Sequence, residues 1–116
     1  IGGEQPIDVA YTIIALNKFS KAFIGENYRK KMHTAFSWFL GNNHLHQIVY
    51  NPCTGGCYDG LEDHYINLNQ GAESTVSYFM ARLAMQELSL QTEADKFISK
   101  AIQNSTAIPE LDEVVI

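Results

Sequence analysis

The stretch from residue 44 to residue 71 constrains the fold most, because it separates helical patterns and has no helical period of its own. Proline and glycine interrupt it at five positions, Pro52, Gly55, Gly56, Gly60 and Gly71. A connection this long without regular structure is unusual in a compact domain, and is commonly either functional or disordered. Disorder is disfavoured because apolar side chains recur along it, at Tyr58, Leu61, Tyr65, Ile66 and Leu68. We therefore predict an ordered, functional loop.

Two helices are predicted before this loop. The first begins at Pro6, which suits the first helical position, and ends at Gly25. Its apolar residues surround nearly the whole helix, so we expect it to be buried on more than one side. The second helix runs from about residue 27 to residue 40 and carries a single apolar stripe. Its members are Tyr28, Met32, Ala35, Phe36, Phe39 and Leu40.

Two further helices are predicted after the loop. One begins near Ala72, with a stripe formed by Val76, Phe79, Met80, Leu83 and Leu88. The other begins at Thr92, whose hydroxyl group suits a helix N-cap. A tail containing Pro109 follows residue 103. The sequence thus predicts one all-α domain over residues 1–116, with about four helices in two αα-hairpins joined by a long loop between helices two and three.

Composition excludes some classes of function and points to missing surroundings. The net charge is -5 with only eight Lys and Arg residues, which argues against nucleic-acid binding. No apolar run approaches the about 20 residues of a membrane span, and no signal-peptide pattern opens the chain. Two plain thiols fit a reducing compartment, so we expect a cytoplasmic protein. Charged residues make up 18%, below the usual figure of about 25%. Because the chain begins with Ile1 rather than Met, we expect a fragment whose surface is covered by further chain, a partner or a ligand.

The candidate site residues lie in and beside the segment 51–75. Its glycines permit close approach of the backbone to a ligand, and its carboxyl and amide groups suit the hydroxyl groups of a sugar. Glu73 and Asp59 are the candidate catalytic acids or bases. Each also has a structural interpretation, Glu73 as a dipole or capping carboxylate and Asp59 as a turn residue before glycine. The candidate substrate-binding residues are Asn67, Asn69, Gln70, Tyr58 and Trp38. The asparagines also suit loop backbone groups, and Trp38 also suits the core.

A zinc site is the weaker alternative for this part of the chain. Cys53 and Cys57 lie near His44 and His46, but the Cys-x3-Cys spacing differs from the common Cys-x2-Cys knuckle. A disulfide over so short a separation needs special backbone geometry. We therefore expect two free thiols and neither a metal ion nor another cofactor.

Four strings occur in order along the chain and carry a family resemblance. They are Gln5-Pro6-Ile7-Asp8, Trp38-Phe39-Leu40-Gly41-Asn42-Asn43, Thr54-Gly55-Gly56-Cys57-Tyr58-Asp59-Gly60-Leu61 and Asn67-Leu68-Asn69-Gln70-Gly71-Ala72-Glu73-Ser74-Thr75. Over roughly residues 4–88 the chain resembles the C-terminal helical region of bacterial glycosyltransferase-like proteins. Those proteins are similar to the six-hairpin, or (α/α)6 toroid, glycosidase superfamily. The resemblance implies a partial toroid, with the polar loop at one open end facing a glycan.

Two functions follow from these observations. The first is a helical domain of a carbohydrate-active protein, glycosyltransferase-associated or glycosidase-like, that presents the segment 51–75 to a carbohydrate. A toroid needs about twelve helices, so we expect this chain alone to be inactive. The second is a non-catalytic docking or dimerisation module that packs on its parent chain or on a second copy. A homodimer that covers the apolar first helix is compatible with both. We expect neither nucleic acid nor a membrane as a partner.

Overall fold

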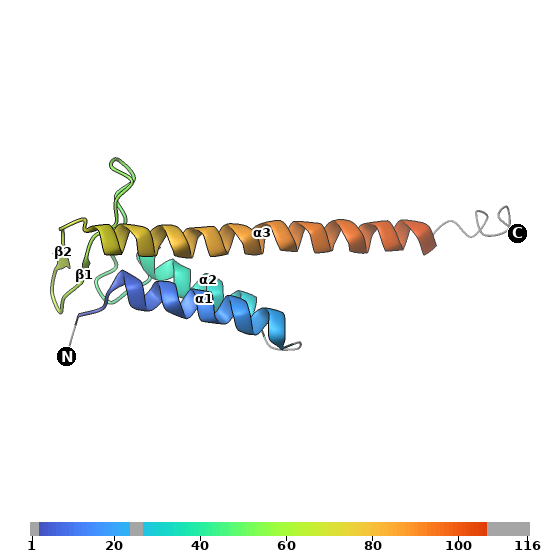
Figure 1. The fold of residues 1–116 in the computed structure, drawn as a ribbon, viewed down its shortest axis with the longest axis horizontal. Helices are drawn as coiled ribbons and strands as arrows, with labels where there is room; N and C mark the ends of the chain where they lie inside the picture. The colour runs from blue at the N-terminus through green and yellow to red at the C-terminus, as the bar shows by residue number, and fades with distance from the viewer. Residues whose placement is uncertain (1–2, 24–26, 107–116) are drawn as a thin grey trace, which may run out of the picture. The chain divides into compact units, whose positions relative to one another are not determined.

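The computed structural model describes residues 3–23 and 27–106 (Figure 1). Its elements are the helices α1 (Pro6–Ala22), α2 (Tyr28–Phe36) and α3 (Ala72–Thr106), a 3-10 helix η1 (Ser37–Leu40), and the short strands β1 (Gly60–Leu61) and β2 (Ile66–Asn67). The chain divides into two units, Ile1–Gln86 and Glu87–Ile116. The first unit holds the core and every feature of the candidate site.

Helix α1 begins as its sequence predicts and packs along α2. Pro6 occupies the first turn together with Asp8, and the backbone N–H of Phe23 donates to the carbonyl of Phe19 at the other end. Of its side chains only Pro6, Ala10 and Ile13 are buried, while Tyr11 is 62% exposed. The expectation that this helix is buried on more than one side is therefore not met within this chain. Its predicted end at Gly25 lies outside the described residues.

Helix α2 tightens into η1 and ends at a glycine. The side chain of Asn27 caps α2 by accepting a hydrogen bond from the Lys30 N–H at 3.2 Å. The turn after η1 closes at Gly41, whose φ of 110° is in the left-handed region that favours glycine. Helices α1 and α2 lie against each other, so the first of the two predicted αα-hairpins is present.

An aromatic cluster forms the core of the first unit. Phe39 is fully buried and contacts Trp38 and Tyr78 edge to face, each with a centroid separation of 5.2 Å. Tyr78, on α3, also stacks on Tyr50 from the long connection, at 5.1 Å. Trp38 is only 9% exposed. The core therefore joins α2, η1, the connection and the start of α3.

The connection between η1 and α3 is ordered, as predicted, and contains a small antiparallel sheet. Strand β1 pairs with β2, with Leu61 opposite Ile66. Glu4, just before α1, forms a β-bridge with Leu61 from the other side. A second isolated bridge joins Tyr50 to Cys57. The sheet therefore ties the start of α1 to the segment that leads into α3.

The prediction of four helices in two hairpins is wrong. The second pair is a single helix, α3, from Ala72 to Thr106, and the described residues also contain the two-stranded sheet. No Gly or Pro interrupts this helix. Thr92, predicted as an N-cap, instead donates its hydroxyl group to the carbonyl of Leu88 at 2.9 Å, as a helix-interior residue does. One hairpin and a third helix do not make the predicted partial toroid of stacked hairpins.

The second unit is helical up to residue 106. Several of its large apolar side chains are exposed, namely Leu90, Phe97, Ile98 and Ile102. The predicted tail with Pro109 lies outside the described residues. No helix among the described residues has the length and apolar character needed to cross a bilayer.

Candidate functional site

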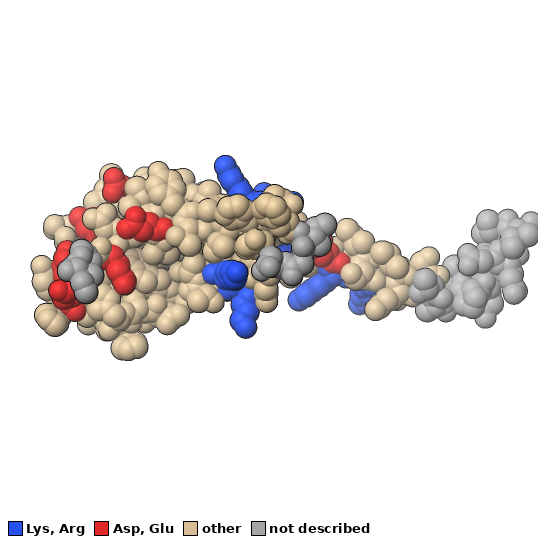
Figure 2. Space-filling model, turned by 90° about the horizontal axis from the view of Figure 1, so that it is seen from below, with Lys and Arg blue, Asp and Glu red and all other residues tan. Residues whose placement is uncertain are grey.

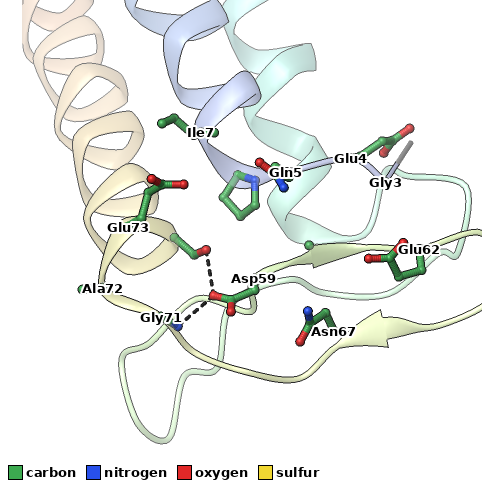
Figure 3. Close-up of a pocket in the computed structure, with 13 residues that line it drawn as sticks. Gly3, Glu4, Gln5, Ile7, Asp59, Glu62, Asn67, Gly71, Ala72 and Glu73 are labelled. Carbon is green, nitrogen blue, oxygen red and sulfur yellow. Dashed lines mark hydrogen bonds between the residues drawn. The ribbon is translucent and has the colours of Figure 1, made fainter. Parts of the chain in front are cut away.

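A pocket of about 420 Å³ opens in the first unit where α1 and α3 begin (Figure 3). Three segments line it: residues 3–7 before and in α1, residues 59, 60 and 62 with residue 67 of the sheet, and residues 71–74 at the start of α3. Four of the lining residues carry carboxyl groups, Glu4, Asp59, Glu62 and Glu73, and no Lys, Arg or His is among the lining residues. We call this cavity the acidic pocket.

Backbone pairing holds the wall of the acidic pocket in place. The N–H of Glu4 donates to the carbonyl of Leu61 at 2.9 Å, and the N–H of Leu61 donates back to the carbonyl of Glu4 at 2.8 Å. A Cβ atom at Gly60 would lie 2.8 Å from the Glu4 carbonyl oxygen. Only glycine permits this approach, which explains why the string Asp59-Gly60-Leu61 occurs at this point.

Asp59 anchors the connection to the start of α3. Its Oδ1 atom accepts hydrogen bonds from the Gly71 N–H at 2.8 Å and the Ser74 hydroxyl at 2.9 Å. Within the described residues, its Oδ2 atom has no hydrogen-bond partner. A carboxylate at a helix N-terminus satisfies unpaired N–H groups and stabilises the helix dipole. One oxygen of Asp59 therefore has a structural role, and the other is available to a ligand.

Glu73 lies in the first turn of α3 and is exposed. Its carboxylate points toward the start of α1, and it shares the acidic pocket with Asp59 (Figure 3). Unlike Asp59, it makes no hydrogen bond within the described residues. The structure thus brings the two predicted catalytic residues to one cavity, with different roles for their carboxylates.

Asn67 is the third predicted site residue in the acidic pocket. It belongs to β2, and its side-chain Oδ1 accepts the N–H of Asn69 at 3.1 Å. Because this bond uses only the oxygen of the amide, the side-chain NH2 group remains a donor for a ligand. Asn67 therefore adds a donor to a pocket whose other polar side chains are mainly acceptors.

The other four predicted binding residues do not line the acidic pocket. Gln70 accepts a hydrogen bond from the Thr54 hydroxyl at 2.6 Å, and Asn69 is exposed, with its carbonyl accepting the Asp59 N–H at 2.8 Å. Tyr58 is half-buried elsewhere in the connection. Trp38 points inward and donates its indole Nε1–H to Glu4 Oε2 at 2.6 Å. Neither Tyr58 nor Trp38 is therefore placed to stack on a sugar in the acidic pocket.

Sequence reasoning did not single out Glu4, Gln5 and Glu62, which also line the acidic pocket. Glu4 and Glu62 stand in no motif, and only the pairing of Glu4 with Leu61 brings them to the pocket. His44 contacts both Glu4 and Glu62. Its Nε2–H donates to the carbonyl of Glu62 at 2.8 Å. Its Nδ1 atom lies 3.7 Å from Glu4 Oε1.

The zinc alternative finds no support in the arrangement of the thiols. No group of three or more His, Cys, Asp or Glu residues is placed to hold a metal ion in the part of the chain that the structure describes. Cys53 is exposed, and Cys57 is buried with its thiol directed at the Tyr58 carbonyl. Burial, with a smaller contribution from the charge of Asp59, raises the pKa of Cys57 to about 12. The Cys57 thiol of the folded chain is therefore protonated at neutral pH.

Acidic side chains gather at the end of the first unit where the pocket opens, as Figure 2 shows. No protein-family model matches the chain, and no curated protein matches its sequence. The acidic pocket offers carboxylate and carbonyl acceptors, amide donors and no Lys, Arg or His, a set that suits an uncharged ligand rich in hydroxyl groups.

Proposed function

We propose that the acidic pocket binds a neutral carbohydrate and that the chain is a helical domain of a carbohydrate-active protein. The observation that carries the proposal is the convergence of Asp59, Asn67 and Glu73 on one cavity. Its volume of about 420 Å³ falls within the range of small-molecule sites. The resemblance of the strings that contain these residues to glycosyltransferase-like proteins supports the same reading.

The charge of the pocket favours a neutral sugar over a phosphorylated or uronic one. Four of the lining residues are acidic and none is Lys, Arg or His, so an anionic ligand would meet like charges without a cation to pair with. Hydroxyl groups, in contrast, donate well to carboxylate oxygens, and charge-assisted bonds of this kind are the stronger ones. Glu73 and the Oδ2 atom of Asp59 are the acceptors that we assign to sugar hydroxyl groups.

Binding is the activity that we assign to this chain by itself. Glycoside hydrolysis by acid–base catalysis uses a pair of carboxyl groups, and this pocket contains such a pair. Bond formation or cleavage would involve the rest of a parent protein, whether glycosyltransferase-associated or glycosidase-like. We therefore propose that this chain is the carbohydrate-binding part of such a protein.

The test is a titration of the chain with methyl glucoside, methyl mannoside and methyl galactoside, followed by amide chemical shifts in NMR spectra. Glu73→Gln and the double variant Glu73→Gln, Asp59→Asn are compared with the unmodified chain, after circular dichroism shows equal folding. The amide oxygen of Glu73→Gln can still accept a hydroxyl group, but the bond is no longer charge-assisted, a difference of about 1 kcal/mol that corresponds to an affinity about fivefold lower. The shifts should map to residues 59–74.

Asp63→Asn is the matched control for charge. Asp63 is exposed in the turn between β1 and β2 and does not line the acidic pocket. It should bind like the unmodified chain. Equal affinity in the Glu73→Gln variant and the unmodified chain, or no binding of any of the three sugars, would contradict the proposal.

The alternative of a docking or dimerisation module is favoured by exposed apolar side chains on α3. In the first unit these include Val76 at 55% and Leu83 at 63% exposure. Apolar groups this exposed commonly mark a protein–protein surface when they are contiguous. Sedimentation velocity tests whether the chain forms a dimer. A dimer that dissociates in the Leu83→Lys variant would support self-association through α3. A monomer at all concentrations would exclude a homodimer.

A further inference from the structure

A second cavity lies beside the acidic pocket, between α1 and α2, and has a volume of about 450 Å³. It shares three lining residues with the acidic pocket, Gly3, Glu4 and Gln5. The rest of its wall comes from both helices, from η1 and from the turn after it, namely Asp8, Val9, Thr12, Thr34, Ala35, Trp38 and Asn42. We call it the interhelical cavity.

The two cavities differ in character. The interhelical cavity is lined by the apolar residues Val9, Ala35 and Trp38 and by two threonines, and its other polar residues are Glu4, Gln5, Asp8 and Asn42. The acidic pocket is lined mainly by carboxyl, amide and hydroxyl groups. An apolar wall with a few polar groups is the usual composition of a small-molecule site. A pyranose ring has both kinds of surface, since its edge carries hydroxyl groups and its face carries C–H groups.

Glu4 stands between the cavities and is held from two directions. Its Oε2 atom accepts the indole N–H of Trp38 at 2.6 Å, and its backbone pairs with Leu61 through two hydrogen bonds. Figure 3 shows the segment Gly3–Gln5 running past the acidic pocket into α1, with the Glu4 side chain directed away from Asp59. The shared wall is thus a single extended segment fixed at both its backbone and its side chain.

We propose that the interhelical cavity is a second sugar subsite of the same binding site. One sugar unit occupies the acidic pocket, and the next unit places its C–H face against Val9 and Ala35 while it passes Glu4. The ligand is then a neutral disaccharide or longer glycan. This inference rests on the proposed function, because it requires a sugar in the acidic pocket.

The position of the two cavities favours this occupant over an unrelated one. They adjoin along Gly3–Gln5, since these three residues form part of both walls. A ligand longer than one sugar unit can therefore reach from one cavity to the other past Glu4. Neither wall contains a Lys, Arg or His residue to pair with an anionic group, so the proposed chain of sugar units is uncharged.

The experiment compares methyl glucoside with cellobiose, methyl mannoside with mannobiose, and methyl galactoside with lactose by isothermal titration calorimetry. The unmodified chain should bind at least one disaccharide about tenfold more tightly than the matching monosaccharide. Thr12→Phe fills the interhelical cavity from α1 and should remove that gain while the monosaccharide affinity stays the same. Thr12 is exposed, and its hydroxyl bonds only within α1, so the fold should tolerate the change.

Thr34→Phe repeats the test from α2, where Thr34 is also exposed and its hydroxyl bonds only within the helix. Thr12→Ser keeps the cavity open and should preserve the gain of the disaccharide. Equal affinities for monosaccharide and disaccharide in the unmodified chain, or a gain that survives both filling variants, would overturn the second subsite and leave the proposed function intact. Absence of binding by all six sugars would overturn both.

Discussion

Asp59 accepts a hydrogen bond from the Ser74 hydroxyl at 2.9 Å, across 15 positions of sequence, and so ties the start of the sheet to the first turn of α3. The same oxygen accepts the Gly71 N–H. Asp59→Ala removes both bonds and leaves Ser74, which is 7% exposed, without its partner. We expect the free energy of unfolding to fall by about 2–3 kcal/mol, measured by urea denaturation.

Asp59→Asn is the matched comparison, because the amide oxygen still accepts from both donors while the charge is lost. We expect it to cost less than half of the effect of Asp59→Ala. Equal unfolding midpoints for the unmodified chain and Asp59→Ala would show that this contact does not stabilise the fold.

Trp38→Phe tests how much the hydrogen bond from the Trp38 indole to Glu4 stabilises the fold. Phenylalanine keeps most of the contact with Phe39 but cannot donate to Glu4 Oε2. We expect a loss of about 1–3 kcal/mol in the free energy of unfolding, since hydrogen bonds to charged groups are worth roughly this much. Glu4→Gln offers a check, because its side-chain oxygen can still accept the indole N–H and should lose less stability than Trp38→Phe.

Thr92→Ala separates a continuous α3 from two helices that meet at Thr92. At an N-cap, replacing Thr with Ala costs about 1 kcal/mol. In a helix interior, Ala has the higher helix propensity, by roughly 0.5 kcal/mol. Because Thr92 bonds back to Leu88, we expect equal or higher stability and unchanged helicity in thermal denaturation followed by circular dichroism. A clear loss of stability would instead indicate that a helix begins at Thr92.

Buried Cys57 should make stability fall at high pH. Its pKa rises from 9.0 to about 12 in the folded chain, mainly through burial. Between these values the unfolded chain has lost the thiol proton and the folded chain has kept it, so stability falls as the pH rises. From about pH 8 to about pH 10 we expect a loss of about 1.4 kcal/mol, measured by urea denaturation.

Cys57→Ala is the control, because the variant lacks the titrating thiol and should show a flatter profile over the same range. Burial also raises the pKa of Tyr78, which acts in the same direction at higher pH, so the comparison ends near pH 10. Identical slopes for the variant and the unmodified chain would rule out Cys57 as the cause.

Local signals in the sequence were sufficient for the starts of the helices. Pro6 and the string before Ala72 mark where α1 and α3 begin, as the structure confirms. The stripe of the second helix likewise predicts α2 and η1. The extent of α3 was mispredicted because a threonine hydroxyl serves equally well as a cap or as a donor to the preceding turn, and only its hydrogen bond to Leu88 distinguishes the two.

The candidate site was predictable where its residues lie close in sequence to α3. Asn67 and Glu73 stand in one string, and Asp59 precedes a glycine that the fold requires. Glu4 and Glu62 were not predictable, because their places depend on the distant pairing of Glu4 with Leu61. Trp38 was open to two interpretations, and the structure shows it buried, bonded to Glu4 and in the wall of the interhelical cavity alone.

The pairing of Glu4 with Leu61 also sets an order of events in folding. The contacts between α1 and α2 are local in sequence and form quickly, whereas closing the long loop between Glu4 and Leu61 is slower. The wall shared by the two cavities should therefore be completed last. A refolding chain would become helical first, and would acquire its capacity for ligands in a later kinetic phase.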